Sequence, residues 1–211
     1  MSAAQAGGPG ADGADGADRA DVKGRPTVVI VPGLRGHVPD HWQTLLAGRL
    51  TEAGRTVLTV PPLTRDPLSL EARVAALGDV VARAGGPVLL VAHSAGVLIT
   101  VHWAQRHTAE VAGALLAAPP DFGTPLPEGY PTPEDLDKHG WTPVPRDPLP
   151  FPSIVAAGSN DPLASFDEVA ALADDWGSRL VALGEVGHLN PASGHGEWSR
   201  AEILVRALDR G

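Results

Sequence analysis

Near its centre the chain reads Val91-Ala92-His93-Ser94-Ala95-Gly96, between a continuous apolar run and a stretch with helical apolar spacing. The preceding run, Pro87 to Ala92, is typical of a strand buried on both faces of a parallel sheet. The six residues match the pattern small-x-Ser-x-Gly, in which a tight strand-to-helix turn needs small flanking residues and lifts a serine hydroxyl above the sheet. The pattern makes Ser94 the candidate nucleophile; the competing interpretation is that Ser94 only caps the helix.

Strands and helices alternate on both sides of this turn. Asp40 and Ser69 are candidate N-cap residues of two of the helices. Alternation of apolar strands with helices predicts an α/β fold, a doubly wound and mostly parallel six-stranded sheet with helices on both faces, in a single domain over residues 25–211. The other predicted strands are 27–31, 56–60, 111–117, 152–157 and 179–183, and the helices are 40–50, 69–84, 94–106, 165–176 and 197–208.

Two more side chains that could activate the Ser94 hydroxyl follow the ends of predicted strands, first an acid and then a histidine. Asp161 comes after the fifth strand, within Ser159-Asn160-Asp161-Pro162, and His188 comes after the sixth, within Val186-Gly187-His188. The carboxyl ends of parallel strands meet at one edge of the sheet, so we expect both near Ser94. Since a serine needs an oriented base to attack, His188 is predicted to be the base and Asp161 its partner.

A second acid competes for the same role. Asp121 follows the fourth strand in Ala118-Pro119-Pro120-Asp121, a position that some serine hydrolases use. Asp161 is preferred because it lies in a tight Asn-Asp-Pro turn and follows the strand next to the one that precedes the histidine.

Two backbone amides are candidates for stabilising a negative oxygen. Ala95 begins the predicted helix, where a free N–H and the helix dipole favour an anion. In a doubly wound sheet the loop after the first strand, Pro32 to Gly36, faces this turn, and Leu34 is the expected second donor. Two phosphate-binding motifs are absent from this loop: a glycine-rich stretch that ends in Gly-Lys-Ser/Thr, and the pattern G-x-G-x-x-G. Their absence argues against phosphate binding there.

Two segments interrupt this pattern. Residues 119–152 hold 11 of the 21 prolines, and so long a loop in a compact domain is typical of a lid or a binding wall, with a rigid packing excursion as the alternative. Residues 1–24 repeat Gly, Ala and Asp and show no hydrophobic periodicity. This composition predicts a disordered tail, with an acidic interaction tail as the alternative. We expect the substrate pocket to be lined by His41, Trp42, Phe122 and Trp141.

Composition excludes several classes of protein. The 211 residues carry a formal net charge of −9, which argues against a nucleic-acid-binding surface. The chain has no cysteine, which excludes disulfides and a thiolate metal site or nucleophile. The sequence contains no run of 18 apolar residues, so no membrane-spanning helix is predicted. Its first residues include no apolar segment typical of a secretory signal, so a cytoplasmic protein is expected. His37 and His41 could bind a metal, but no third ligand follows at suitable spacing, and no cofactor is expected.

These motifs together resemble a known group. The chain is similar over about residues 26–208 to the α/β-hydrolase superfamily, and within it to the YdeN and retinoblastoma-binding-protein-9 group of small serine hydrolases. The marks are Val31-Pro32-Gly33 with Pro39-Asp40-His41-Trp42, the Ala-His-Ser-Ala-Gly turn, Pro150-Phe151-Pro152-Ser153, Ser159-Asn160-Asp161-Pro162, and Gly187-His188-Leu189-Asn190 with Ser193-Gly194. The resemblance implies a compact hydrolase that lacks the superfamily's first two strands, with Ser94, Asp161 and His188 as its triad.

The resulting hypothesis is a serine hydrolase that cleaves an ester or amide of a small-molecule acyl substrate through an acyl-enzyme. Two alternatives stay open, a hydrolase-fold binding protein without turnover and an acyltransferase or thioesterase with the same triad.

Overall fold

The computed structural model describes residues 24–209, and its centre is a six-stranded sheet in the order β2-β1-β3-β4-β5-β6. All neighbouring strands are parallel, so the predicted α/β architecture is confirmed and the sheet is wholly rather than mostly parallel. Each strand lies within one or two residues of its predicted range. The strands are β1 (Thr27–Val31), β2 (Val57–Thr59), β3 (Val88–His93), β4 (Val111–Ala117), β5 (Ser153–Ala157) and β6 (Arg179–Ala182).

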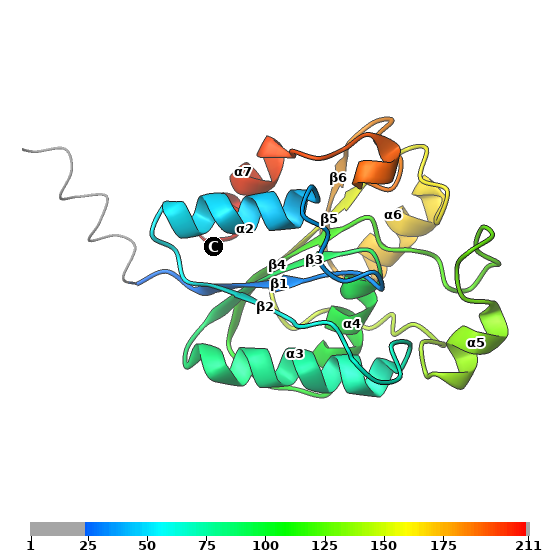
Figure 1. Cartoon of the computed structure of the whole chain (residues 1–211), viewed down its shortest axis with the longest axis horizontal. Coiled ribbons are helices and arrows are strands. Elements are labelled where there is room, and N and C mark those ends of the chain that lie inside the picture. Colours follow the sequence, from blue (N-terminus) through cyan, green and yellow to red (C-terminus); the bar gives the residue numbers. More distant parts are fainter. Residues whose placement is uncertain (1–23, 210–211) are drawn as a thin grey trace, which may run out of the picture.

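Helices cover both faces of the sheet, because successive strand residues point to opposite sides and both sets are apolar. On one face α2 (Trp42–Glu52) and α7 (Ser199–Leu208) pack against alternate residues of the strands, among them Ile30 and Val91. On the other face lie α3 (Leu70–Ala84), α4 (Ala95–Ala104) and α6 (Phe166–Asp175). Figure 1 shows α2 and α7 above the sheet and α3 and α4 below it. Within residues 24–209, no helix combines the length and apolar character needed to cross a bilayer.

The local differences from the sequence expectations have simple causes. Helix α2 spans Trp42–Glu52 where 40–50 was predicted, and its N-cap is His41 rather than Asp40. The His41 ring accepts from the Gln43 amide. A short helix, α5 (Pro133–Lys138), lies in the proline-rich segment, where Thr132 and Asp135 form a capping box. A 3₁₀ turn, η1 (Pro191–Ser193), follows β6. Apart from Gly24, the predicted tail of residues 1–24 lies outside the described residues.

The position of the central turn depends on a close contact between helix α4 and strand β1. A Cβ built on Gly96 would lie 2.2 Å from the carbonyl oxygen of Val31 and 2.9 Å from that of Pro32. Only glycine allows this approach, because both obstructing atoms belong to the backbone. Gln43 ties the same region together, since its side-chain amide donates to the carbonyls of Val31 and Val91 at 3.1 and 2.9 Å. The start of α4 is therefore fixed against the carboxyl ends of β1 and β3.

We expect Gly96→Ala to destabilise the protein by more than about 2 kcal/mol, because the added methyl forces backbone to move. The measurement is chemical denaturation. Gly48→Ala is the matched control: Gly48 lies inside α2 with nothing within 4 Å of its built Cβ, so alanine there should stabilise by about 0.5–1 kcal/mol through helix propensity. Equal effects of the two substitutions would show that the close contact is not what requires glycine at position 96.

Candidate active site

Ser94 occupies the turn between β3 and α4 with φ 58° and ψ −132°, a backbone conformation that non-glycine residues rarely adopt. Such a residue costs of order 1–3 kcal/mol and persists only where its surroundings hold it. Its amide donates to the carbonyl of Ala117 at 2.9 Å. Its side chain makes no capping hydrogen bond to α4, so the hydroxyl is free to point elsewhere.

The structure brings the serine, the histidine and the later acid together. Ser94 Oγ lies 2.8 Å from His188 Nε2, and His188 Nδ1 lies 2.8 Å from Asp161 Oδ2. The side chains of His188 and Asp161 are only 6% and 3% exposed. A carboxylate only accepts hydrogen bonds, so Nδ1 carries a proton, and in the neutral ring Nε2 then accepts from the serine hydroxyl.

The loops that carry these side chains are fixed by neighbouring contacts. Asp161 Oδ1 accepts from the Leu163 amide at 2.9 Å, and Asn160 Oδ1 accepts from the Gly187 amide at 2.7 Å. Gly187 has φ 54°, and a Cβ there would lie 2.6 Å from Cβ of Ser193. The loops after β5 and β6 are thus bonded to each other next to His188.

Asp121 is engaged in a different interaction. Its Oδ1 accepts from the Gly123 amide at 2.8 Å and its Oδ2 from Thr124 Oγ1 at 2.9 Å. Both oxygens serve the local turn after β4. Of the two candidate acids, the structure places Asp161 against the histidine.

The two predicted backbone donors flank Ser94. Ala95 is the first residue of α4, so its amide has no acceptor within the helix. Gly33 packs directly on the serine, and a Cβ built there would lie 3.1 Å from Ser94 Cβ, which brings the adjacent Leu34 peptide close to the turn. Neither the Leu34 nor the Ala95 amide donates a hydrogen bond to another group of residues 24–209.

Two further histidines lie behind His188. The centre of the His93 ring lies 5.0 Å from that of His188 and 4.6 Å from that of His41, with the rings tilted to one another, and His93 Nε2 donates to the His188 carbonyl at 2.9 Å. Burial, with a smaller contribution from His188, lowers the pKa of His93 well below its ordinary value. The same causes, burial first, lower the pKa of His41 to about 4. Both rings are therefore neutral at pH 7, and they support His188 without adding charge.

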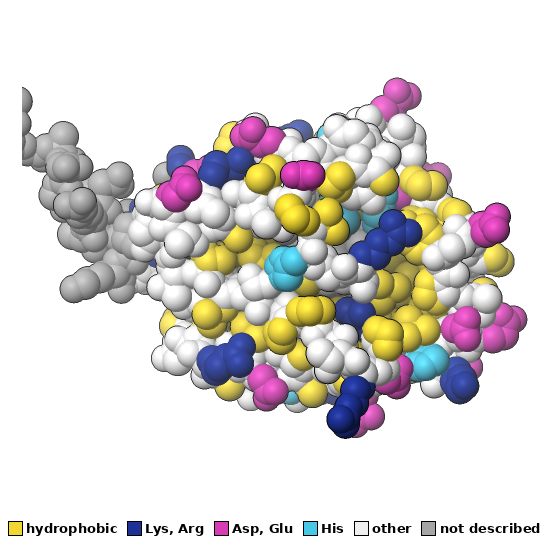
Figure 2. All heavy atoms as spheres, in the orientation of Figure 1, with side chains coloured by type: hydrophobic (Ala, Val, Ile, Leu, Met, Phe, Trp, Pro, Cys, Tyr) yellow, Lys and Arg dark blue, Asp and Glu magenta, His cyan; other side chains and the backbone are white. Residues whose placement is uncertain are grey.

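The residues expected to line a pocket occupy different places. Trp42 and Trp141 have no exposed surface and Phe122 is 2% exposed, so these side chains belong to the core and cannot touch a ligand in this conformation. His41 is 9% exposed and caps α2. Figure 2 shows one face of the molecule. Its right half has a hollow bordered by hydrophobic side chains, with cationic and histidine side chains at the rim. Arg35 reaches the proline-rich segment, its guanidinium carbon 5.3 Å from the Tyr130 ring centre.

Sequence reasoning missed Gln43 and His93 as residues that position the site. Gln43 stands in the first turn of an amphipathic helix, where a buried polar side chain gives no signal by itself. His93 was visible within the turn motif, but its contact with the His188 carbonyl depends on tertiary structure. Among residues 24–209 no group of three or more His, Cys, Asp or Glu could hold a metal ion.

The low pKa of His41 has a consequence for acid stability. The unfolded chain binds a proton at the ordinary pKa of 6.5, whereas the folded protein resists protonation until about pH 4. Stability contributed by neutral His41 is therefore complete above pH 6.5 and lost as the pH falls toward 4, by about 2 kcal/mol at pH 5. His41→Asn keeps an N-cap acceptor and should reduce the fall in unfolding free energy between pH 7.5 and pH 5, measured by denaturation at each pH. An identical fall in both proteins would contradict a buried neutral His41.

Comparison with known proteins agrees with the fold. The chain is 28% identical to a protein from Pectobacterium atrosepticum described as a YdeN-like hydrolase, with a TM-score of 0.73 over 91% of this chain and 95% of that one. The ydeN gene product of B. subtilis, 18% identical, has a similar fold, with a TM-score of 0.69 over 88% of this chain and 100% of the other. A search of curated protein sequences finds no match.

A family model described as serine hydrolase matches residues 28–207, which include the serine turn, both candidate acids and His188. The match spans most of the chain. The protein belongs to the serine hydrolase family and is an enzyme of the hydrolase type.

Proposed function

We propose that this hydrolase cleaves an ester or amide of a small acyl compound through a covalent acyl-serine intermediate. The observation that carries the proposal is the continuous series of hydrogen bonds from Ser94 Oγ through His188 to Asp161, each 2.8 Å long. A serine, an imidazole and a carboxylate in this order provide a nucleophile, a base and a group that orients the base.

In the first half of the reaction Ser94 Oγ attacks the acyl carbonyl while its proton passes to His188 Nε2. The imidazolium is stabilised by Asp161, which stays a carboxylate. His188 then gives the proton to the leaving oxygen or nitrogen as that bond breaks. In the second half a water molecule loses a proton to His188 and attacks the acyl-serine. As the second tetrahedral intermediate collapses, His188 gives that proton to Ser94 Oγ, which releases the acid and restores the enzyme.

The negative oxygen of each tetrahedral intermediate is assigned to the amides of Leu34 and Ala95. Both groups lack an acceptor among the described residues, and the dipole of α4 adds to the field at Ala95. Removal of one such donor costs about 10²- to 10³-fold in kcat in other enzymes. No step of this mechanism requires a metal or an organic cofactor.

The same residues would also serve an acyltransferase or a thioesterase, in which another acceptor or leaving group replaces water or alcohol. A binding protein without turnover would have no use for the aligned hydroxyl, imidazole and carboxylate. We propose small-molecule acyl substrates, no nucleic-acid or membrane partner and a cytoplasmic location; the net charge of −9 supports the absence of a nucleic-acid partner.

The direct test of the function is labelling with a fluorophosphonate probe together with hydrolysis of activated esters of increasing acyl length. We expect the wild type to be labelled once and to hydrolyse short esters. Ser94→Ala should lose both activities while its free energy of unfolding stays within about 1 kcal/mol, since a small turn residue contributes little packing. Hydrolysis that survives in a folded Ser94→Ala protein would rule out this nucleophile.

The two acids are separated by a matched pair of substitutions. Asp161→Asn should lower kcat by about 10³- to 10⁴-fold, because an amide can hold the imidazole in the wrong tautomer. Asp121→Asn keeps one oxygen acceptor in its turn and should change kcat less than threefold. Steady-state kinetics on one activated ester decides between them. The reverse ranking would assign the acid to the loop after β4.

A further inference from the structure

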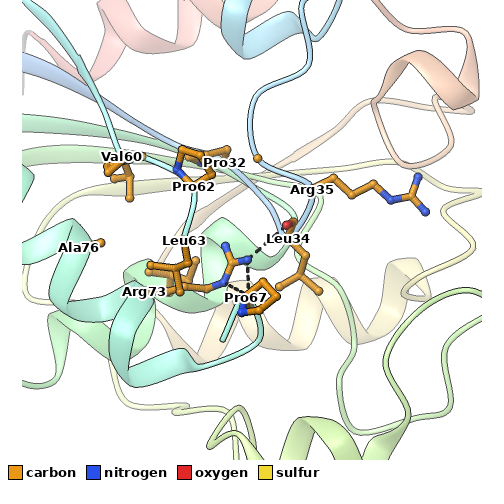
Figure 3. Close-up of a pocket in the computed structure, with 12 residues that line it drawn as sticks. Pro32, Leu34, Arg35, Val60, Pro62, Leu63, Pro67, Arg73 and Ala76 are labelled. Atoms are coloured by element: carbon orange, nitrogen blue, oxygen red, sulfur yellow. Dashed lines mark hydrogen bonds between the residues drawn. The ribbon is translucent and has the colours of Figure 1, made fainter. Parts of the chain in front are cut away.

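Arg73 is a buried cation whose partners are all carbonyl oxygens. It lies in the first turn of α3 and is 7% exposed. Its Nε and Nη2 donate to the Pro67 carbonyl at 2.9 and 2.6 Å, and Nη2 also donates to the Leu34 carbonyl at 3.2 Å. No carboxylate of residues 24–209 pairs with it. Figure 3 shows the guanidinium between these two carbonyls.

This arrangement is unfavourable for stability when considered alone. A cation near a helix N-terminus opposes the helix dipole, and burying a charge without a counter-charge is costly. Burial lowers the pKa of Arg73 from its ordinary value. The hydrogen bonds to the Pro67 and Leu34 carbonyls must offset this cost. The two segments that carry these carbonyls therefore indicate what Arg73 does.

The Pro67 side of the contact is held firmly. The next carbonyl, that of Leu68, accepts from Nε1 of the fully buried Trp141 at 2.7 Å. The Ser69 amide donates to the Asp66 carbonyl at 3.1 Å, and the Ser69 side chain caps α3. Arg73 is therefore anchored to a loop that is itself bonded to the core.

The Leu34 side has little other support. Within residues 33–36, the main chain makes one other hydrogen bond among the described residues, from the Gly36 amide to the Gly33 carbonyl at 3.1 Å. The Arg73 guanidinium fixes the carbonyl of the residue whose amide is assigned to the reacting oxygen. Since oxyanion stabilisation depends on donors fixed before the reaction, the conformation of Leu34 matters directly for the rate.

We propose that Arg73 is a positioning residue that holds the Leu34 amide in place for the negative oxygen of the tetrahedral intermediate, by bonding the Leu34 carbonyl to the loop before α3. The inference rests on the proposed function, because it concerns the same oxygen. Arg73 makes no hydrogen bond to Ser94 or His188, and in this proposal it acts through the Leu34 carbonyl.

The test compares Arg73→Lys with wild type, with all rates expressed per Ser94 that reacts with a fluorophosphonate. A lysine keeps the charge but cannot reach two carbonyls with a planar fork. We expect kcat for an activated ester to fall about 10- to 100-fold, as for a misplaced oxyanion donor, while KM changes less than threefold.

A pair of inhibitors supplies a readout that a purely structural role would not move. A trifluoromethyl ketone adds to Ser94 and forms a negative oxygen, whereas the corresponding methyl ketone binds without adding. Arg73→Lys should weaken the trifluoromethyl ketone by the same factor as kcat and leave the methyl ketone within twofold.

Arg55→Lys is the matched control for loss of a buried arginine. Arg55 is 6% exposed, pairs with Asp209 and donates to the Pro26 carbonyl. Pro26 precedes β1 and Arg55 precedes β2, so this contact lies at the amino ends of the strands, opposite to the serine turn. This variant should lose stability but keep kcat and both inhibition constants. If Arg73→Lys has kcat within twofold of wild type, or alters both inhibitors equally, the proposal is wrong.

Two further variants, Pro67→Gly and Arg73→Ala, test the proposal if Arg73→Lys folds poorly. Pro67→Gly, at an exposed position, keeps Arg73 but loosens its anchor, and should lower kcat and trifluoromethyl ketone affinity together by about threefold or more. In Arg73→Ala, guanidinium chloride at non-denaturing concentration should restore part of kcat, since the removed group borders a cavity of about 70 Å³; sodium chloride should not. Unchanged kcat in Pro67→Gly, or equal effects of the two salts, would overturn the proposal.

A failure of the proposed function would look different. In that case wild type itself would show no Ser94-dependent labelling or hydrolysis. Failure of the Arg73 inference alone would leave wild-type labelling and hydrolysis intact.

Discussion

The close approach of α4 to the end of β1 is the contact on which the site depends. Because Gly96 has no side chain, the first turn of the helix can press against the Val31 carbonyl. That contact fixes where Ser94 leaves the sheet and keeps it in its unusual backbone conformation. It also brings the loop after β1 beside the serine, with Gly33 in contact with the Ser94 side chain. One missing methyl group thus sets the relative position of the nucleophile and of both proposed oxyanion donors.

The remaining parts of the site follow from the parallel sheet. Strands β5 and β6 end at the same edge as β3, so their loops deliver Asp161 and His188 to Ser94. Behind them, neutral His93 and His41 fill the space between α2 and His188. Their low pKa values keep positive charge away from the imidazole that must accept a proton in the proposed mechanism.

The sequence predicted the sheet well because most strands are apolar runs with a glycine or proline close to at least one end, which is a local signal. The serine turn, Asp161 and His188 were recognisable for a similar reason, since each lies in the turn or loop that follows a strand. Helix α5 was missed because its capping box lies in a proline-rich segment that suggested loop. The burial of Trp42 and Trp141, and the contacts of Gln43 and Arg73, depend on segments far apart in the chain, and no local pattern encodes them.

In the proposed mechanism Ser94 carries the acyl group during turnover. Mixing the enzyme with an activated ester, quenching with acid within milliseconds and mapping the peptides by mass spectrometry tests it directly. We expect one acyl group per enzyme on the peptide that contains Ser94, and none in Ser94→Ala. An acyl group on another residue, or rapid hydrolysis with no acylated peptide at any time after mixing, would contradict the proposed mechanism.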